Sequence, residues 1–220
     1  LTTINQLTKE GQCGIADPVK PGIVASTVLG TLSILGYDPL KKTVSRGVVE
    51  AMGCGIKINI GDVALRGNWA TLDEKGLIVD RRAGRIREGI NELALSISGQ
   101  KIDNVRIDVA AGTEHRIAVV LRGPGLQDCV SGSDPGDHFH SGINPRPVKP
   151  LNKNNPKCIR VAELLNQFEL RARVILAKHP VNLIRVSKNL LPANAILTRE
   201  PGQYFYFPKI KRPSGMGLSG

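Results

Sequence analysis

Three arginines lie within five residues in the segment 80–85, which reads Asp-Arg-Arg-Ala-Gly-Arg. The segment follows a short apolar run over 77–80 that predicts a strand, and it precedes a helical pattern over 86–97. Guanidinium groups match phosphate and carboxylate oxygens through paired hydrogen bonds, and the first turn of a helix adds backbone donors. The sequence therefore predicts an anion site here, with a solvated charge run as the alternative. The three arginines are Arg81, Arg82 and Arg85.

A second group of polar residues, Glu114, His115 and Arg116, lies at the expected turn between strands 105–110 and 116–121. Histidine titrates near neutral pH, so His115 is a candidate proton carrier, and Arg116 is a candidate anion clamp. The alternative is an ordinary surface turn. Arg66 lies within an apolar strand, where we expect it to face solvent or to form an ion pair with Asp62 or Asp80.

The segment 123–150 is rich in Gly, Pro, Asp and Ser, and it predicts a long loop. Aspartate and histidine at close spacing are metal ligands in many proteins. A polar loop without metal is nevertheless the favoured interpretation. The residues concerned are Ser133, Asp134, Asp137, His138 and His140.

The composition restricts the classes of function. The 220 residues carry a formal net charge of +11, which favours anionic ligands, and 41% of them are apolar, enough for a core. The basic residues bind either nucleic acid or a small phosphorylated molecule, but no known nucleic-acid module is recognisable. No apolar run approaches the length of a membrane span. A basic run over 209–212 near the end would suit an anionic partner such as RNA.

Four cysteines lie far apart, and no pair has the spacing of a zinc site or a small disulfide framework. We therefore expect reduced thiols and a reducing compartment, either the cytoplasm or an organelle interior, and not secretion. The first fourteen residues predict a helix, with Ile4 and Leu7 on one face, and no signal peptide. The cysteines are Cys13, Cys54, Cys129 and Cys158.

The remaining patterns predict a mixed fold of helices and strands, either α/β or α+β. The clearest helix is expected over 159–178, followed by a shorter helix over 181–188. Further strands are expected over 14–16, 63–72 with an interruption at Gly67, and 195–198. A helix is expected over 46–52, and 29–35 is apolar enough to be buried.

Laid in order, several motifs resemble those of the archaeal-type cofactor-independent phosphoglycerate mutases. The resemblance covers most of residues 11–200. Its fold implication is a partial alkaline-phosphatase-like core, of class α/β, with an inserted α+β substrate-binding domain. The motifs lie at 21–24, 33–39, 45–53, 61–71, 80–85, 114–116, 133–135, 179–182 and 191–194.

The resemblance implies interconversion of 3-phosphoglycerate and 2-phosphoglycerate in glycolysis, with two divalent metals, usually manganese or zinc. A serine of the family takes the phosphoryl group and returns it, and the inserted domain holds glycerate with arginines. The implied domains are a core fragment over 1–43, the substrate-binding domain over 44–205, and a basic tail or return to the core over 206–220. The implied substrate-binding residues are Arg46, Arg66, Arg81, Arg82, Arg85, His115 and Arg116.

The chain departs from the family at the nucleophile loop. Thr27 occupies the nucleophile position and Ser26 is the neighbouring alternative, whereas Val28 and Thr31 replace the family's aspartate and histidine. The family's metal ligands lie outside the resembling segment, so we expect no metal bound by this chain alone and no turnover. Three explanations stay open: a piece of a longer mutase, a non-catalytic structural or binding subunit of a larger complex, or an enzyme whose metals another chain supplies.

Overall fold

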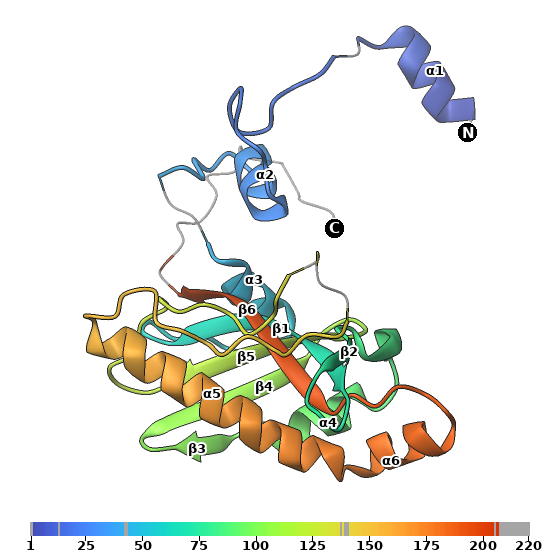
Figure 1. The fold of residues 1–220 in the computed structure, drawn as a ribbon. Coiled ribbons are helices and arrows are strands. Elements are labelled where there is room, and N and C mark those ends of the chain that lie inside the picture. Colours follow the sequence, from blue (N-terminus) through green and yellow to red (C-terminus); the bar gives the residue numbers. More distant parts are fainter. Residues whose placement is uncertain are drawn as a thin grey trace. The chain divides into compact units, whose positions relative to one another are not determined.

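The computed structural model describes residues 2–12, 14–41, 44–136, 138, 141–204 and 206. The chain divides into two compact units, Leu1–Thr43 with Pro208–Gly220, and Val44–Phe207 (Figure 1). The first unit contains helices α1 (Thr2–Glu10) and α2 (Thr27–Ile34). None of the helices in the described residues has both the length and the apolar character needed to cross a bilayer.

The larger unit is built on a six-stranded antiparallel sheet. The strand order is β2-β1-β5-β4-β3, and β6 pairs with β1. The long central strand β1 therefore contacts β5, β6 and β2, and side chains from all these strands can meet around it. The strands are β1 (Val63–Leu72), β2 (Ile78–Asp80), β3 (Gln100–Ile102), β4 (Val105–Ala111), β5 (Arg116–Arg122) and β6 (Ala195–Gln203).

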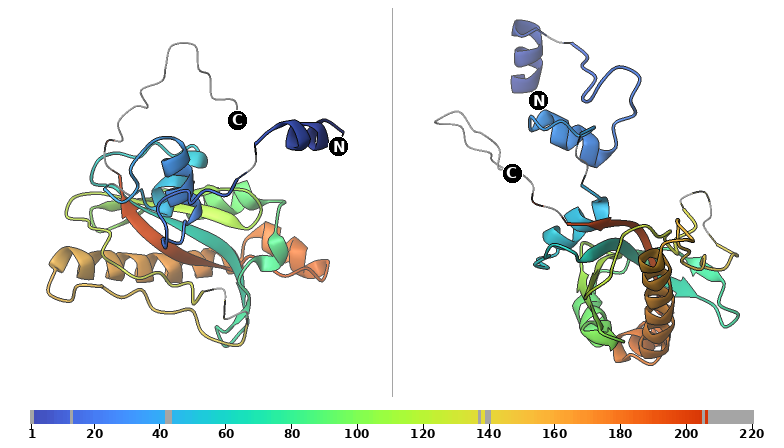
Figure 2. Two further views of the ribbon diagram at one scale, coloured as in Figure 1. Left: turned by 90° about the horizontal axis from the view of Figure 1, so that it is seen from above. Right: turned by 90° about the vertical axis from the view of Figure 1, so that its left-hand side faces the viewer.

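Helices cover both faces of this sheet. Successive residues of a strand point to opposite faces, and Leu65 of β1 packs with Phe168 of α5 (Pro156–Ala177) in the main core. Ala64 packs on the other face against α3 (Arg46–Gly53). The long α5 runs across the sheet in Figure 1 and is seen foreshortened in the right-hand view of Figure 2. Every residue of β1 is consequently buried, including its polar ones.

The other helices of this unit are α4 (Ile90–Ile97), the single turn η1 (Ala83–Arg85) and α6 (Pro180–Ser187). The side chain of Asn182 anchors α6, since it donates to the carbonyls of Leu176 and Ala193 at 2.8 and 2.9 Å and accepts from the Ala193 amide at 2.7 Å. The 179–182 motif of the sequence therefore has a structural role, joining α5, α6 and the start of β6.

The predicted mixture of helices and strands is confirmed. The predicted helices that correspond to α1, α5 and α6 are also confirmed, and so is the pairing of β1 with β2. Several details of the prediction are wrong. Residues 14–16 form no strand, β1 runs through Gly67 without interruption, and Ile34 of the segment expected to be buried is 79% exposed. The short strand β3 was not predicted.

The expectation of four reduced thiols is also wrong. Cys129 and Cys158 form a disulfide, with their Cα atoms 5.3 Å apart. Twenty-nine positions separate the two cysteines, so no short-range sequence motif predicts this disulfide. Cys54 is free and half-buried, and Cys13 lies outside the described residues.

Candidate anion-binding pocket

A cavity of about 310 Å³ on the α3 face of the sheet is lined almost entirely by charged side chains. It brings together six of the seven residues that the resemblance assigned to the substrate surface. Arg81 is the seventh and does not line it. The lining consists of Arg46, Arg66, Asn68, Arg82, Arg85, Glu114, His115, Arg116 and Arg199.

The sheet itself supplies the floor of this arginine pocket. Arg66 and Asn68 are two positions apart on β1 and therefore share a face. Arg116 of β5 is the register partner of Asn68, and Arg199 of β6 is the register partner of Arg66. Directly paired residues of neighbouring strands have side chains in contact range, so antiparallel pairing gathers three arginines at one place.

Arg46 comes from the start of α3, which lies unusually close to the sheet. A Cβ on the next residue, Gly47, would lie 2.4 Å from the Ala64 carbonyl oxygen, so only glycine permits this approach. The Ser45 hydroxyl caps the helix by accepting from the Gly47 amide at 3.1 Å, and it donates to the Glu200 carbonyl at 2.8 Å. These contacts fix the first turn of α3 and with it Arg46.

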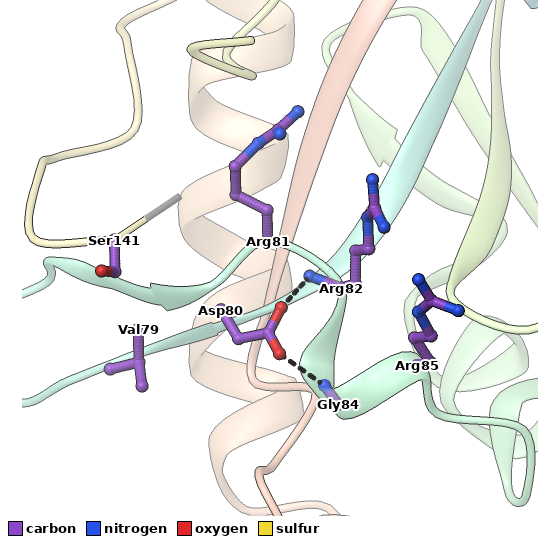
Figure 3. A pocket seen from close by; sticks show the side chains of 7 residues that line it. All are labelled: Val79, Asp80, Arg81, Arg82, Gly84, Arg85 and Ser141. Carbon is purple, nitrogen blue, oxygen red and sulfur yellow. Dashed lines mark hydrogen bonds between the residues drawn. The ribbon is translucent and has the colours of Figure 1, made fainter. Parts of the chain in front are cut away.

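Arg82 and Arg85 come from the tight turn after β2. The Asp80 carboxylate accepts from the amides of Arg82 at 2.6 Å and Gly84 at 3.0 Å (Figure 3). The side chains of Arg82 and Arg85 leave the two ends of this turn in a similar direction in the same view. Asp80 thus acts through the backbone, not as an ion-pair partner of Arg66.

The turn is strained. Ala83, Gly84 and Arg85 have φ angles of 45°, 64° and 55°. Residues other than glycine adopt this left-handed backbone region only at a cost in conformational energy. Arg185 of α6 donates to the Ala83 carbonyl at 3.2 Å and to the Leu191 carbonyl at 2.9 Å, which ties the turn to the helix behind it. Backbone strain of this kind concentrates at functional sites.

Arg81 points elsewhere. Its Nε and Nη2 donate to the two carboxylate oxygens of Asp134, each at 2.8 Å, and its side chain is only 4% exposed. This two-pronged ion pair joins β2 to the 123–150 loop. Arg81, which the sequence predicted to bind an anionic ligand, therefore pairs with a buried carboxylate of the protein itself.

A second cavity of about 390 Å³ adjoins the turn after β2 and shares Arg82 and Arg85 with the arginine pocket (Figure 3).

The charge in the arginine pocket is strongly unbalanced. Glu114 is its only acidic lining residue among those described, and Glu114 is ion-paired with Arg87 outside the lining. Arg66 is 7% exposed and lies 3.3 Å from Glu200, so the expectation that it faces solvent or pairs with Asp62 or Asp80 is wrong. Burial and the neighbouring Arg199 lower the pKa of Arg66. Such crowding of cations favours a bound anion.

His115 stands among these cations, with its side chain 12% exposed. Burial and the charges of Arg82 and Arg116 lower its pKa to about 4. The imidazole is therefore neutral at pH 7 in the free pocket, so the prediction of a proton carrier near neutral pH does not hold for that state. Its buried Nδ1 has no hydrogen-bond partner within the part of the chain that the structure describes. A bound anion beside His115 would raise the pKa again.

This depressed pKa predicts acid sensitivity. Because the unfolded histidine titrates near 6.5 and the folded one near 4, the unfolded chain binds the extra proton between these values, and the contribution of His115 to stability falls as the pH falls through that window. Acidification from pH 7 to 5 should lower the free energy of unfolding by about 2 kcal/mol through His115 alone. Urea denaturation of the unaltered chain and of His115→Asn at both pH values isolates this contribution.

The comparison variant is His115→Asn, which should lose about 2 kcal/mol less than the unaltered chain over the same pH interval. His138→Asn, at an exposed position of the 123–150 loop, is the matched control and should behave like the unaltered chain. Equal losses in the unaltered chain and in His115→Asn would contradict the burial of a neutral imidazole.

The described residues do not fit a divalent metal. No group of three or more His, Cys, Asp or Glu side chains converges among them. Asp134, a candidate ligand in the loop, accepts from Arg81, and Ser133 belongs to a hydrogen-bonded network with Glu169. Asp137 and His140 lie outside the described residues, as does the basic run over 209–212.

The two candidate nucleophiles belong to the first unit. Thr27 is exposed at the first position of α2, and the Ser26 hydroxyl caps that helix by accepting from the Leu29 amide at 3.3 Å. Ser26 therefore has a local structural role, while the Thr27 hydroxyl lies at a helix start where backbone donors favour anions.

Two lining residues escaped sequence analysis, Arg199 and Asn68. The predicted strand over 195–198 ended just before Arg199. In the structure β6 continues to Gln203, with an irregular register opposite 64–66. Asn68 was quoted only within a motif, although its spacing of two from Arg66 places both on one face.

Comparisons with known proteins identify the relatives of this chain. Residues 8–182 match the family model described as 2,3-bisphosphoglycerate-independent phosphoglycerate mutase. The protein of that name from Picrophilus torridus is 45% identical over 199 residues, which are 90% of this chain and 47% of that protein. A Methanothermobacter thermautotrophicus relative is 42% identical over 202 residues, 90% of this chain and 48% of the relative.

A solved structure, the cofactor-independent phosphoglycerate mutase from Thermoplasma acidophilum, superposes with a TM-score of 0.70 at 40% identity. The match covers 82% of this chain and 47% of that structure. The chain spans about half the length of the curated relatives that it matches. With the family model covering most of its residues, the chain belongs to the 2,3-bisphosphoglycerate-independent phosphoglycerate mutase family.

Proposed function

We propose that this chain binds phosphoglycerate in the arginine pocket, as the substrate-holding part of a mutase that interconverts 3-phosphoglycerate and 2-phosphoglycerate. The observation that carries the proposal is the gathering of six arginines around one cavity. Among the described residues only one acidic side chain, Glu114, lines this cavity, and it is already ion-paired. Guanidinium groups bind phosphoryl and carboxylate oxygens in the same two-pronged manner.

The shape of the site supports a ligand with two anionic ends. Phosphoglycerate carries a phosphoryl group and a carboxylate. The arginine pocket and the adjoining cavity have Arg82 and Arg85 in common. One anionic group would contact Arg66, Arg116 and Arg199 on the sheet, and Arg82 and Arg85 would lie between the two groups. Neutral His115 would accept a hydrogen bond from a ligand hydroxyl or take up a proton once the anion is bound.

For catalysis we propose that Thr27, or else Ser26, receives the phosphoryl group from one glycerate oxygen and returns it to the other. The manganese or zinc of the family would stabilise the charge of the transferring group. The described residues offer arginines and no convergent metal ligands. We therefore propose that this chain binds substrate without turning it over by itself.

A non-catalytic subunit of a larger complex, with RNA as one of the candidate partners, is the second candidate function. The sequence 26–31, Ser-Thr-Val-Leu-Gly-Thr, favours it, since Val28 and Thr31 replace a carboxylate and an imidazole that the family's chemistry uses. The excess of basic residues is consistent with an anionic partner.

Mutase activity of the purified 220-residue chain, assayed with added manganese and 3-phosphoglycerate, separates these functions. We expect no turnover together with binding of 3-phosphoglycerate. Turnover abolished by Thr27→Ala, but not by Ser26→Ala, would show that Thr27 works as the nucleophile and that the chain is not inactive alone. Absence of both turnover and binding would favour the structural subunit.

A further inference from the structure

The 123–150 loop runs along β6 beside the arginine pocket. The amides of Ser133 and Asp134 donate to the Thr198 carbonyl at 2.8 and 3.1 Å. The approach is so close that a Cβ on Gly132 would lie 2.2 Å from the same oxygen and 2.7 Å from the Cα of Arg199. The loop is thus hydrogen-bonded to β6 at Thr198, the residue just before Arg199.

Glu169 of α5 holds the loop and the strand together. Its Oε1 accepts from the hydroxyls of Ser133 and Thr198, each at 2.7 Å. The Ser133 hydroxyl in turn accepts from the Thr198 amide at 2.9 Å. One carboxylate oxygen therefore connects a helix, a loop and a strand, in a position that the proposed chemistry does not use.

The residues that follow Ser133 and Thr198 in the sequence link this junction to the pocket. Asp134 follows Ser133, and Arg199 follows Thr198. The Asp134 Oδ2 lies 3.7 Å from Nη1 of Arg199, and the same carboxylate binds Arg81. Arg199 lines the arginine pocket opposite Arg66. Glu169 is thereby one hydrogen bond and one peptide bond away from Arg199, whose side chain lines the pocket.

We propose that Glu169 is a positioning residue for Arg199. By accepting hydrogen bonds from the hydroxyls of Ser133 and Thr198, it holds the Ser133–Asp134 segment against β6. The Arg199 guanidinium group is thereby oriented toward the bound anion. The inference rests on the proposed function, because its readout is phosphoglycerate affinity. It adds to that function a residue outside the pocket whose charge state tunes the site.

The surroundings of Glu169 make its charge sensitive to pH. Burial raises its pKa to about 7, against the opposing effect of the Ser133 and Thr198 hydroxyls and the charge of Arg173 on the same helix. Further charged residues near the junction are Asp134, Arg81 and Arg199. Arg146 is another, since its amide donates to the Ser133 carbonyl at 2.9 Å. An ionised carboxylate accepts stronger hydrogen bonds than a neutral one, so protonation below pH 7 loosens the junction.

Titration calorimetry of 3-phosphoglycerate binding at pH 8.5 and pH 6.0 tests this role. Glu169→Gln keeps the shape and a carbonyl acceptor but imitates the protonated state. We expect it to bind about fivefold more weakly than the unaltered chain at pH 8.5, the scale of one hydrogen bond. At pH 6.0, where the unaltered carboxyl is itself protonated, the two affinities should converge to within about twofold.

Three further variants distinguish the positioning role from a general loss of structure. Glu163→Gln changes an exposed glutamate of the same helix and should match the unaltered chain at both pH values. In an Arg199→Gln background, Glu169→Gln should cause no additional loss if it acts through Arg199. Should Glu169→Gln fail to fold, Thr198→Val removes one of the two hydroxyls and should weaken binding about threefold at pH 8.5.

The outcomes separate this inference from the proposed function. An equal affinity ratio at both pH values, or an undiminished effect of Glu169→Gln without Arg199, would overturn the positioning role while the proposed function stands. No binding of 3-phosphoglycerate by the unaltered chain at either pH would overturn both.

Discussion

Replacing Arg82 and Arg85 together by glutamine should weaken 3-phosphoglycerate binding by about 100-fold or more. Each charge-assisted hydrogen bond from a guanidinium contributes about 1.5–3 kcal/mol, and the variant removes at least two of them. The backbone of the turn should persist, because the Asp80 carboxylate holds it through the amides of Arg82 and Gly84. Titration calorimetry measures the affinity, and circular dichroism verifies the fold.

The matched control removes the same charge from other places. Arg106 pairs with Asp108 and Arg160 contacts Asn104, and neither arginine lines the pocket. The double change of Arg106→Gln and Arg160→Gln should alter the affinity by less than about threefold, through screened long-range attraction alone. Similar losses in the two double variants would mean that net charge, and not the pocket, attracts the ligand.

Breaking the link between Cys129 and Cys158 should lower the free energy of unfolding by about 3–4 kcal/mol. A cross-link that closes a loop of this length restricts the unfolded chain by roughly that amount. Cys129 lies in the 123–150 loop next to Asp128, whose carboxylate accepts from the Gln203 amide at 3.1 Å, and Cys158 is buried in the first turn of α5. Urea denaturation with and without a phosphine reductant measures the difference.

Cys54→Ala serves as the control, since that thiol is free, and it should respond to the reductant like the unaltered chain. The variant with both Cys129→Ala and Cys158→Ala should unfold at the same urea concentration whether or not reductant is present. An unaltered chain that is indifferent to the reductant would contradict the disulfide and restore the expectation of reduced thiols.

The local patterns of the sequence predicted most of the helices and strands. The apolar period around Phe168 is strong enough to identify α5, and glycine or proline marks most of the ends. The prediction failed where tertiary contacts decide. Gly67 looked like an interruption of β1, yet it lies between β5 and β6 where a Cβ would come within 2.9 Å of Ile117. Strand β3 has only three residues, too few to show a period.

The site was predictable as a set of residue types but not as an arrangement. The 80–85 segment predicted a site that binds anions, and two of its three arginines do line the pocket. That Arg81 turns to Asp134, 53 positions away, is a long-range pairing without local signal. The same holds for Arg199, which reaches the pocket because β6 pairs with β1, and for Glu169, which no motif singled out.

Titration calorimetry of 3-phosphoglycerate into the unaltered chain at pH 8 with EDTA present tests directly whether the arginine pocket binds this ligand. We expect binding at a single site without any divalent metal, weakened by added salt because the contacts are ionic. Failure to bind, or binding that appears only when manganese replaces EDTA, would contradict an arginine pocket that holds the substrate by itself.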